Sequence, residues 1–428
     1  MNAGNNVIKT IIISFALFAS FFGAGNLTLP SAIGLMAGRE WGWALLGFTM
    51  SVALLPFLSF VAVARAGGTE EGIASGMGRA FSIFFTSVMI LCTSLLVTVP
   101  RTAAVVHELG AVTIFGPIPQ VLTSCIFFAM VICLSLNPSA VVEKVGKYLV
   151  PVFVLIMAVV IVKGVFYPID IPADTGVHRA LVLRSAFLDG YQTLNVFGGL
   201  VFSGAVFAAI AEHQPYNRRA QAMMVCGVAV LTGLSLFIIY GGLIYLGATG
   251  SGLFNIRMGY AAVLAALIDS LLFDGLGLPA LIIATIFICS ATAVGLTAGV
   301  SYFFSRVTDD RLSYRNCVVV FCAISLLIST IEADATTRYA VLILTLIYPA
   351  TIVLILLNVF RCCLMNRGTF LGAGGSALVV SFLTMLPAAA PVIGAIPLSV
   401  HGLAWIVPAV ICGILGTVFC KIYERIKA

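Results

Sequence analysis

The sequence predicts an all-α polytopic membrane protein with about twelve transmembrane helices. Of its 428 residues, 61% are hydrophobic and only 9% are charged, whereas a soluble domain has about 25% charged residues. The mean hydropathy is +1.16, and many apolar runs approach or exceed the roughly 20 residues that cross a bilayer. The polar stretches between these runs are too short to form a soluble domain, so we expect residues 1–428 to form a single membrane domain.

Apolar runs separated by short polar loops define the first half of the chain. The segment 168–184 carries mixed charges and a proline, and it is expected to be an external loop. The first expected span is interrupted at residues 23–26, and the sixth at its glycine-rich centre. The six expected spans cover residues 8–36, 43–64, 81–99, 121–136, 148–167 and 187–211.

The second half of the chain continues the pattern, with one exception. Segment 250–277 is amphipathic and only moderately apolar, which predicts a helix lying over the outer face. With a cytoplasmic N-terminus, about two thirds of the 22 lysines and arginines fall on the inner face, so both termini are expected to be cytoplasmic. The remaining spans are expected over residues 222–246, 278–304, 317–331, 340–360, 371–391 and 403–419.

The two interrupted spans point to the functional site. Residues 21–30 read FFGAGNLTLP, a helix break at membrane depth, and free backbone groups there must line a cavity or bind a ligand. A second break five spans later would relate residues 8–167 to residues 187–360 as inverted repeats, with extra helices over 371–419. Such paired breaks mark the binding sites of secondary transporters. For Gly198-Gly199, close helix packing is an equally good explanation.

The chemistry of the broken ends favours a zwitterion. Free N–H groups near residues 27–31 suit a carboxylate, and carbonyls near residues 21–23 and 196–198 suit an ammonium group or a sodium ion. Acidic residues and histidines fall in loops or near span ends, which favours sodium over proton coupling. No organic cofactor is implied, and the partners we expect are a small-molecule substrate, Na⁺ and the lipid bilayer.

Several other classes of function have little support in the sequence. The basic residues are spread over short loops rather than clustered for nucleic-acid binding, and no phosphate-binding loop or catalytic constellation is present, so no enzyme is expected. The alternatives that stay open are a carrier of another small zwitterion or a nucleobase, coupled to sodium or protons. A channel or an intramembrane enzyme fits less well.

Several segments resemble the bacterial branched-chain amino acid:cation symporters, the branched-chain amino acid carrier proteins. They are FFGAGNLTLP, AVARAGG at 62–68, VPRTA at 99–103, VGKYLVP at 145–151 and DGYQTLNVFGGLVFS at 189–203. The resemblance covers nearly the whole chain in order. It implies the 5+5 inverted-repeat fold of sodium-coupled amino acid transporters, and sodium-driven uptake of leucine, isoleucine and valine into the cell through a multi-pass protein of the bacterial cell membrane.

The resemblance also implies which residues bind. The sodium site of that fold commonly has two adjacent hydroxyls in the eighth span, but here Ala291 takes the place of one, and Ser290 lies one position away. The expected substrate-binding residues are Gly23, Ala24, Gly25, Asn26, Asn195, Val196, Phe197, Gly198 and Gly199. The expected sodium ligands are Ala19, Phe22, Ile288, Ala291 and Thr292.

Overall fold

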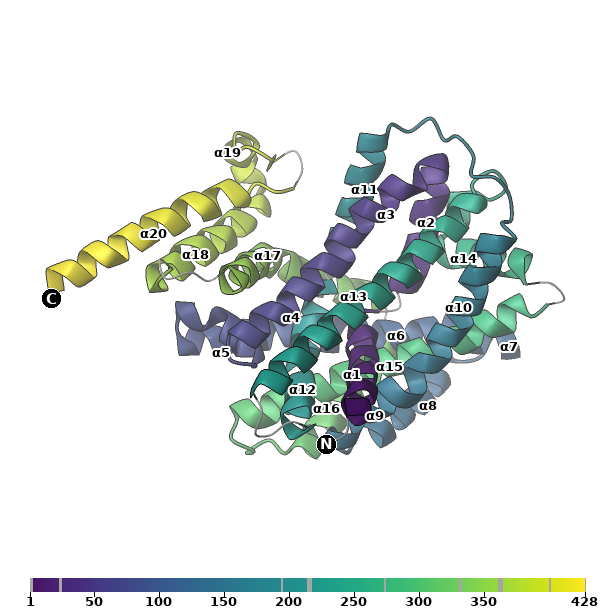
Figure 1. The fold of residues 1–428 in the computed structure, drawn as a ribbon, viewed down its shortest axis with the longest axis horizontal. Helices are drawn as coiled ribbons and strands as arrows, with labels where there is room; N and C mark the ends of the chain where they lie inside the picture. Colours follow the sequence, from purple (N-terminus) through teal and green to yellow (C-terminus); the bar gives the residue numbers. More distant parts are fainter. Residues whose placement is uncertain are drawn as a thin grey trace. The chain divides into compact units, whose positions relative to one another are not determined.

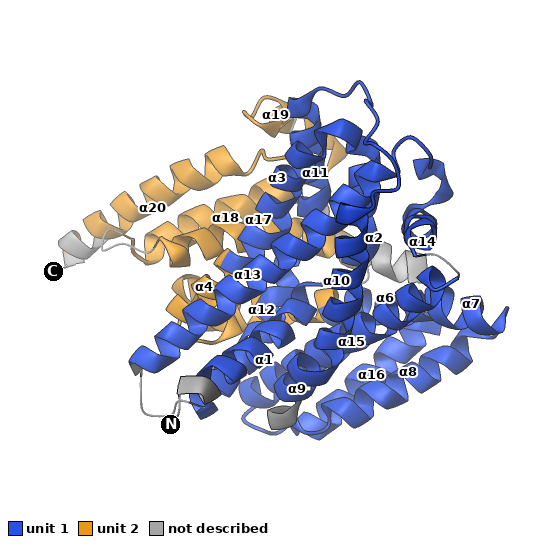
Figure 2. Cartoon of the chain, turned by 45° about the vertical axis from the view of Figure 1, so that its right-hand side comes forward, with its two compact units in different colours: residues 1–57, 94–333 blue, residues 58–93, 334–428 orange. Residues whose placement is uncertain are grey.

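Helices are the only regular secondary structure in the parts of the chain that the computed structural model describes (Figure 1). These parts are residues 3–22, 25–193, 195–213, 218–272, 275–330, 333–360, 365–399 and 402–427. Two compact units divide the chain: residues 1–57 with 94–333, and residues 58–93 with 334–428 (Figure 2). The all-helical prediction is therefore confirmed over the described residues.

The α-helices follow one another with short breaks. As far as residue 192 they are α1 (Ala3–Phe21), α2 (Gly25–Ala37), α3 (Trp41–Thr49), α4 (Leu55–Arg65), α5 (Arg79–Ile90), α6 (Val99–Val105), α7 (Val112–Phe115), α8 (Gln120–Ser135), α9 (Pro138–Lys144), α10 (Val150–Phe166) and α11 (Arg179–Gln192). The rest are α12 (Asn195–His213), α13 (Arg218–Thr249), α14 (Tyr260–Leu271), α15 (Gly277–Val307), α16 (Tyr314–Thr330), α17 (Ala333–Val359), α18 (Arg367–Thr384), α19 (Ala390–Gly394) and α20 (Ile406–Lys427).

Several short 3₁₀ and π segments link these helices. The 3₁₀ segments are η1 (Gly38–Glu40), η3 (Glu70–Met77), η7 (Ile256–Met258) and η8 (Pro387–Ala389). The π segments are η2 (Met50–Leu54), η4 (Leu91–Thr98), η5 (Val106–Ala111) and η6 (Val145–Leu149).

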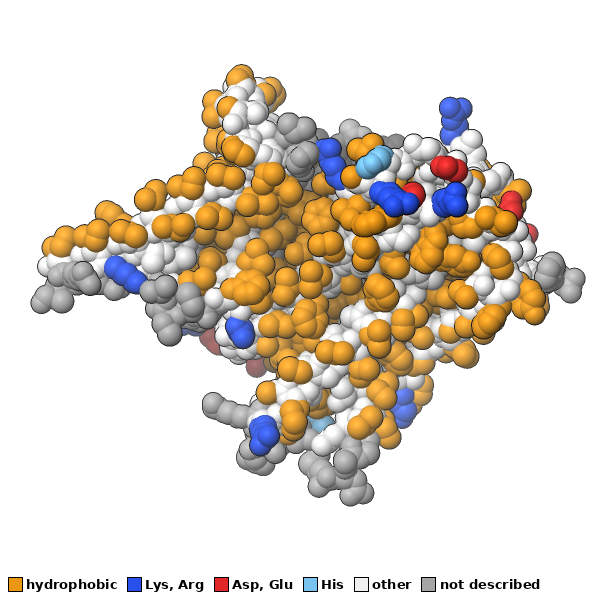
Figure 3. Space-filling model, turned by 45° about the horizontal axis from the view of Figure 1, so that its top comes forward, with side chains coloured by type: hydrophobic (Ala, Val, Ile, Leu, Met, Phe, Trp, Pro, Cys, Tyr) orange, Lys and Arg blue, Asp and Glu red, His pale blue; other side chains and the backbone are white. Residues whose placement is uncertain are grey.

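Helix length and surface chemistry agree with a membrane protein. Among the described residues, seven helical segments are long and apolar enough to cross a bilayer, or eight if a pair bent by 107° counts as one. Helix α10 buries Phe153 and Met157 on one face and exposes Leu155 and Phe166 on another. A helix that is hydrophobic on both faces is typical of a lipid environment. Hydrophobic side chains likewise cover most of the face in Figure 3.

The third expected span is longer than predicted. Helical structure runs over 37 residues, Arg79–Phe115, instead of ending near residue 99. Pro100 lacks an N–H group and would disturb a regular helix. Here it stands at the start of α6, directly after the wide turns of η4. A π segment changes the hydrogen-bonding register of a helix, so the proline is accommodated and the chain continues as a helix.

Helix α14 falls in the amphipathic segment 250–277, where the sequence predicts a helix. Its buried side chains, which include Val263, Leu267 and Leu271, lie on one face. That face packs against α2 and α15. The predicted helix is confirmed.

The core of the first unit forms around α1 and α15. Helix α1 packs against α12, α13 and α15 (Figure 1). Helix α15 is the most enclosed of the long helices, since 78% of an apolar 18-residue stretch within it is buried. The last turns of α1, including Ala16, Phe18 and Ala19, are also fully buried. The break after α1 therefore lies inside the protein.

Candidate functional site

The first break lies where the sequence predicts it. Helix α1 ends at Phe21, and α2 begins at Gly25. The N–H of Phe22 still donates to the carbonyl of Phe18 at 3.0 Å, but the helix goes no further. Gly23 and Ala24, two of the predicted substrate residues, lie outside the described residues. The interruption of the first span is confirmed.

The second break lies earlier than predicted. Helix α11 begins at Arg179, inside the expected external loop, and ends at Gln192, and α12 begins at Asn195. Thr193 ends α11 by donating its N–H and its hydroxyl to the carbonyl of Gly190, at 3.2 and 2.7 Å. The prediction that the helix is interrupted at its glycine pair is wrong. Predicted site residues Val196 and Phe197 are therefore fully buried in the first turn of α12.

Close packing, rather than a break, explains Gly198 and Gly199. A Cβ on Gly198 would lie 2.3 Å from the carbonyl oxygen of Ser20, and one on Gly199 would lie 2.0 Å from the Phe21 ring. Any larger residue at either position would push α12 away from the end of α1. The glycine pair thus brings the first turns of α12 against the break in the first span.

An amide pair joins the two breaks. The side-chain nitrogen of Asn26 donates to the carbonyl of Phe21 at 2.8 Å and to the side-chain oxygen of Asn195 at 3.0 Å. Asn195 in turn donates to the carbonyl of Val52 at 3.3 Å. Both asparagines are buried. Two predicted substrate residues, 169 positions apart, are therefore in direct contact.

Four of the five predicted sodium ligands also meet. The hydroxyl oxygen of Thr292, on α15, lies 2.9 Å from the carbonyl of Ala19, 3.0 Å from that of Phe22 and 2.9 Å from that of Ile288. All four residues are fully buried. A hydroxyl has one proton to donate, so only one of the three carbonyls can accept it at a time. The carbonyl of Ala19 also accepts the N–H of Phe22 at 3.3 Å, and the carbonyl of Ile288 lies within the backbone hydrogen-bond ladder of α15. The four oxygen atoms therefore converge with a single hydroxyl proton between them.

The fifth predicted ligand adds no side-chain oxygen. Ala291 is fully buried and presents only a methyl group. The neighbouring hydroxyl of Ser290 is also buried and has no hydrogen-bond partner among the described residues. One residue along a helix turns the side chain by about 100°, so Ser290 does not replace the missing hydroxyl at position 291.

The sequence reasoning missed two residues near the first break. The Tyr240 ring stacks on Phe22 with centroids 5.2 Å apart. A Cβ on Gly25 would lie 3.6 Å from Nη2 of Arg101, which lies beyond residue 99, the expected end of the third span. The signal that could have indicated Arg101 is a single charge that follows a long apolar run.

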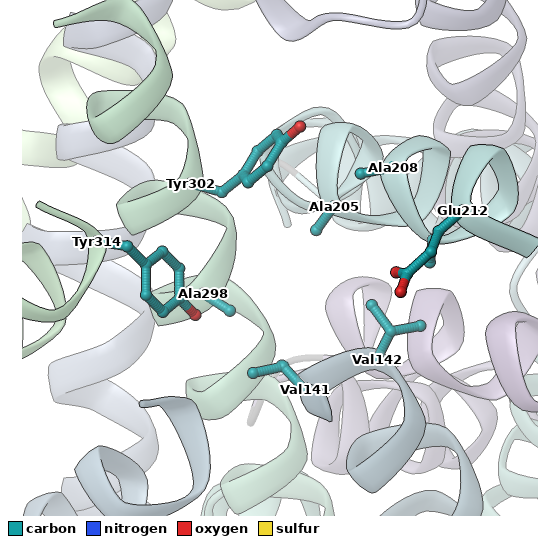
Figure 4. Close-up of a pocket in the computed structure, with 9 residues that line it drawn as sticks. Val141, Val142, Ala205, Ala208, Glu212, Ala298, Tyr302 and Tyr314 are labelled. Atoms are coloured by element: carbon teal, nitrogen blue, oxygen red, sulfur yellow. The ribbon is translucent and has the colours of Figure 1, made fainter. Parts of the chain in front are cut away.

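A cavity of about 160 Å³ lies elsewhere in the same unit (Figure 4). Glu212 on α12 and Tyr302 on α15 line it, and small or branched apolar side chains from α9, α12 and α15 form much of the rest. Tyr314 of α16 also lines it and donates to the carbonyl of Ser135 at 2.9 Å. Its α12 residues lie 10 or more positions after Asn195, so at 1.5 Å per residue the cavity is roughly 15 Å or more along α12 from the break.

Sequence comparison identifies the family. A model of the branched-chain amino acid transport protein family matches residues 6–423. The chain is 31% identical to the branched-chain amino acid permease BraB of Bacillus subtilis, a match that covers 96% of this chain and 95% of that one. It is 29% identical to the branched-chain amino acid permease BrnQ of Escherichia coli K12, with 97% and 96% covered.

Solved structures with a similar fold share little sequence identity with this chain. One is MhsT in complex with L-phenylalanine, with a TM-score of 0.56, 15% identity, and 95% of this chain and 98% of that chain covered. Another is Mhp1 in an inward-facing conformation, with a TM-score of 0.54, 12% identity, and 96% and 91% covered. At these identities the likeness concerns the fold alone. The chain belongs to the branched-chain amino acid transport protein family, a family of multi-pass transporters rather than enzymes.

Proposed function

We propose that this member of the branched-chain amino acid transport protein family is a secondary active transporter that carries leucine, isoleucine or valine into the cell together with sodium. The observation that carries the proposal is the oxygen cluster around Thr292. Its hydroxyl lies within 3.0 Å of carbonyls on both α1 and α15. Carbonyl and hydroxyl oxygens are ligands for hard cations, and a cation at this point would contact all four oxygens, whereas the hydroxyl proton is donated to one carbonyl at a time.

A neutral cluster of oxygens favours sodium over a proton. Proton-coupled carriers place a carboxylate or a histidine within a span, and the described contacts of Thr292 are all with backbone carbonyls. The coupling ion we propose is therefore Na⁺, bound by Ala19, Phe22, Ile288 and Thr292. Ala291 takes part only through its backbone.

The substrate site we propose lies between the two breaks. Residues 23–26 and Asn195 would contact the amino and carboxyl groups, while Val196, Phe197, Gly198 and Gly199 hold α12 against α1. The curated relatives BraB and BrnQ are described as branched-chain amino acid permeases, which supports an aliphatic amino acid as the substrate. Because the site joins α1, α2, α11 and α12, substrate binding would bias how these helices close on one another.

The topology we propose has about twelve spans. Residues 8–167 and 187–360 form two inverted repeats of five spans, and residues 371–419 add two further helices. The lysine and arginine distribution places both termini in the cytoplasm, and the protein resides in the bacterial cell membrane. In this orientation the cavity beside Glu212 and Tyr302 lies toward the cytoplasm, where it would receive the released substrate.

The decisive experiment is uptake of radiolabelled leucine into proteoliposomes that contain the purified protein. We expect accumulation when an inward sodium gradient is imposed, and none when choline replaces sodium at the same membrane potential. Accumulation driven only by an inward proton gradient would overturn the coupling ion. Sodium-driven uptake of another amino acid or of a nucleobase, without leucine uptake, would overturn the substrate.

A further inference from the structure

Arg101 occupies an unusual position for a charged residue. It lies in α6, within the continuous helical run Arg79–Phe115, rather than at either end of it. Its neighbours Pro100 and Thr102 are buried, while its own side chain is exposed. Charged side chains within a span are costly and usually functional.

The guanidinium group of Arg101 is directed at the first helix break. The Cζ, Nη1 and Nη2 atoms lie 3.6–3.8 Å from the position of a Cβ on Gly25, the first residue of α2. The end of α1 beside this position is buried, whereas Gly25 is only partly buried and the Arg101 side chain is exposed. A Cβ at this position would be in ordinary van der Waals contact with the guanidinium, so the glycine leaves the α2 backbone uncovered on the side that faces Arg101.

Arg101 forms no ion pair or hydrogen bond with any other described residue. Other charged residues do form such pairs, for example Lys9 with Glu143 and Arg179 with Glu40. An arginine that is open to water and unpaired can bind an anion in two parallel hydrogen bonds, which is the geometry in which guanidinium groups recognise carboxylates.

We propose that Arg101 binds the α-carboxylate of the substrate and makes that group a requirement for transport. This inference rests on the proposed function and names the residue that selects the substrate's charged end. The positive end of the α2 dipole lies beside the same space and adds to the attraction. A molecule with the same side chain and amino group but no carboxylate would meet an uncompensated positive charge.

The test compares leucine with leucinamide, which keeps the side chain and the amino group but lacks the carboxylate. Inhibition of labelled-leucine uptake by each compound is measured in proteoliposomes. In the wild type, leucine should inhibit far more strongly than leucinamide. In Arg101→Gln the half-saturating leucine concentration should rise roughly 10- to 150-fold, and the preference for leucine over leucinamide should fall toward one.

Two further variants make the result decisive. Arg101→Lys keeps the charge but loses the geometry for two parallel hydrogen bonds, so its preference for leucine over leucinamide should be intermediate. If Arg101→Gln does not fold, Arg101→Lys is the variant that tests the role of Arg101. Arg257→Gln removes an exposed arginine just before α14. It should change neither the half-saturating leucine concentration nor the preference for leucine over leucinamide. A preserved preference in the folded Arg101 variants, with only the transport rate reduced, would assign Arg101 a structural role and overturn the proposal. Failure of the wild type to take up leucine would instead overturn the proposed function.

Discussion

Replacing Thr292 by valine tests the proposed sodium site with little change of shape. Valine keeps the volume and the branched Cβ of threonine but removes the oxygen that contacts the carbonyls of Ala19, Phe22 and Ile288. The site would keep its three carbonyls and lose its only described side-chain ligand. We therefore expect weaker sodium binding, with the leucine site itself intact.

The size of the effect follows from the contact that is lost. An interaction of a polar group with a charge contributes about 1.5–3 kcal/mol, and a tenfold change in affinity corresponds to about 1.4 kcal/mol. The sodium concentration for half-maximal leucine uptake should therefore rise roughly 10- to 150-fold. Without sodium, carbonyls of α1 also lose their buried hydroxyl donor, which should cost about 1–3 kcal/mol of stability.

The same helix supplies a matched control. Thr285 is also a fully buried threonine of α15, and its hydroxyl donates to the carbonyl of Leu281 at 2.8 Å, within its own helix. Thr285→Val removes the same chemical group without touching α1. The sodium dependence of leucine uptake is measured for both variants in proteoliposomes. If Thr292→Val keeps the wild-type dependence, or if both variants shift it equally, the cation does not bind at Thr292.

The remaining predictions concern the two breaks. In thermal unfolding of the detergent-solubilised protein, Asn26→Ala and Asn195→Ala should each destabilise the protein by about 1–3 kcal/mol. The double variant should lose clearly less stability than the sum of the two, because one hydrogen bond joins the pair. Strictly additive losses would contradict the contact. Gly199→Ala should lower stability by about 1–3 kcal/mol through the clash of its Cβ with the Phe21 ring. Gly233 has open space around it, so Gly233→Ala should change stability by no more than about 0.5 kcal/mol. Equal melting temperatures for the two variants would refute the packing argument.

Hydrophobic runs and one glycine-rich break made much of the helical pattern predictable. The break between Phe21 and Gly25 could be located because asparagine and proline follow glycine in a segment otherwise suited to a buried helix. Patterning could not locate the second break, because Gly198-Gly199 suits either an interrupted helix or two helices in close contact. Only the positions of Ser20 and Phe21 decide between these uses.

Arg101 illustrates a different limit of sequence reasoning. Proline commonly ends a helix, and the sequence predicts that the third span ends at residue 99, just before Pro100 and Arg101. The wide turns of η4 take up the missing hydrogen bond, and this change of register is a feature of the fold rather than of any local motif. The contact between Arg101 and the first helix break is therefore visible only in the fold.

The two proposed binding sites share one short piece of backbone, and this gives coupling a physical basis. The carbonyl of Phe21 accepts a hydrogen bond from Asn26, which also contacts Asn195, while the carbonyl of the next residue, Phe22, belongs to the oxygen cluster at Thr292. A peptide plane that turns to bind a cation also moves its neighbour, because consecutive peptide planes share a Cα atom. An ion at Thr292 would therefore favour one arrangement of the break, and a substrate that prefers the same arrangement would bind more tightly in its presence. By linkage the substrate must strengthen ion binding by the same factor, so the sodium concentration for half-maximal uptake should fall as the leucine concentration is raised.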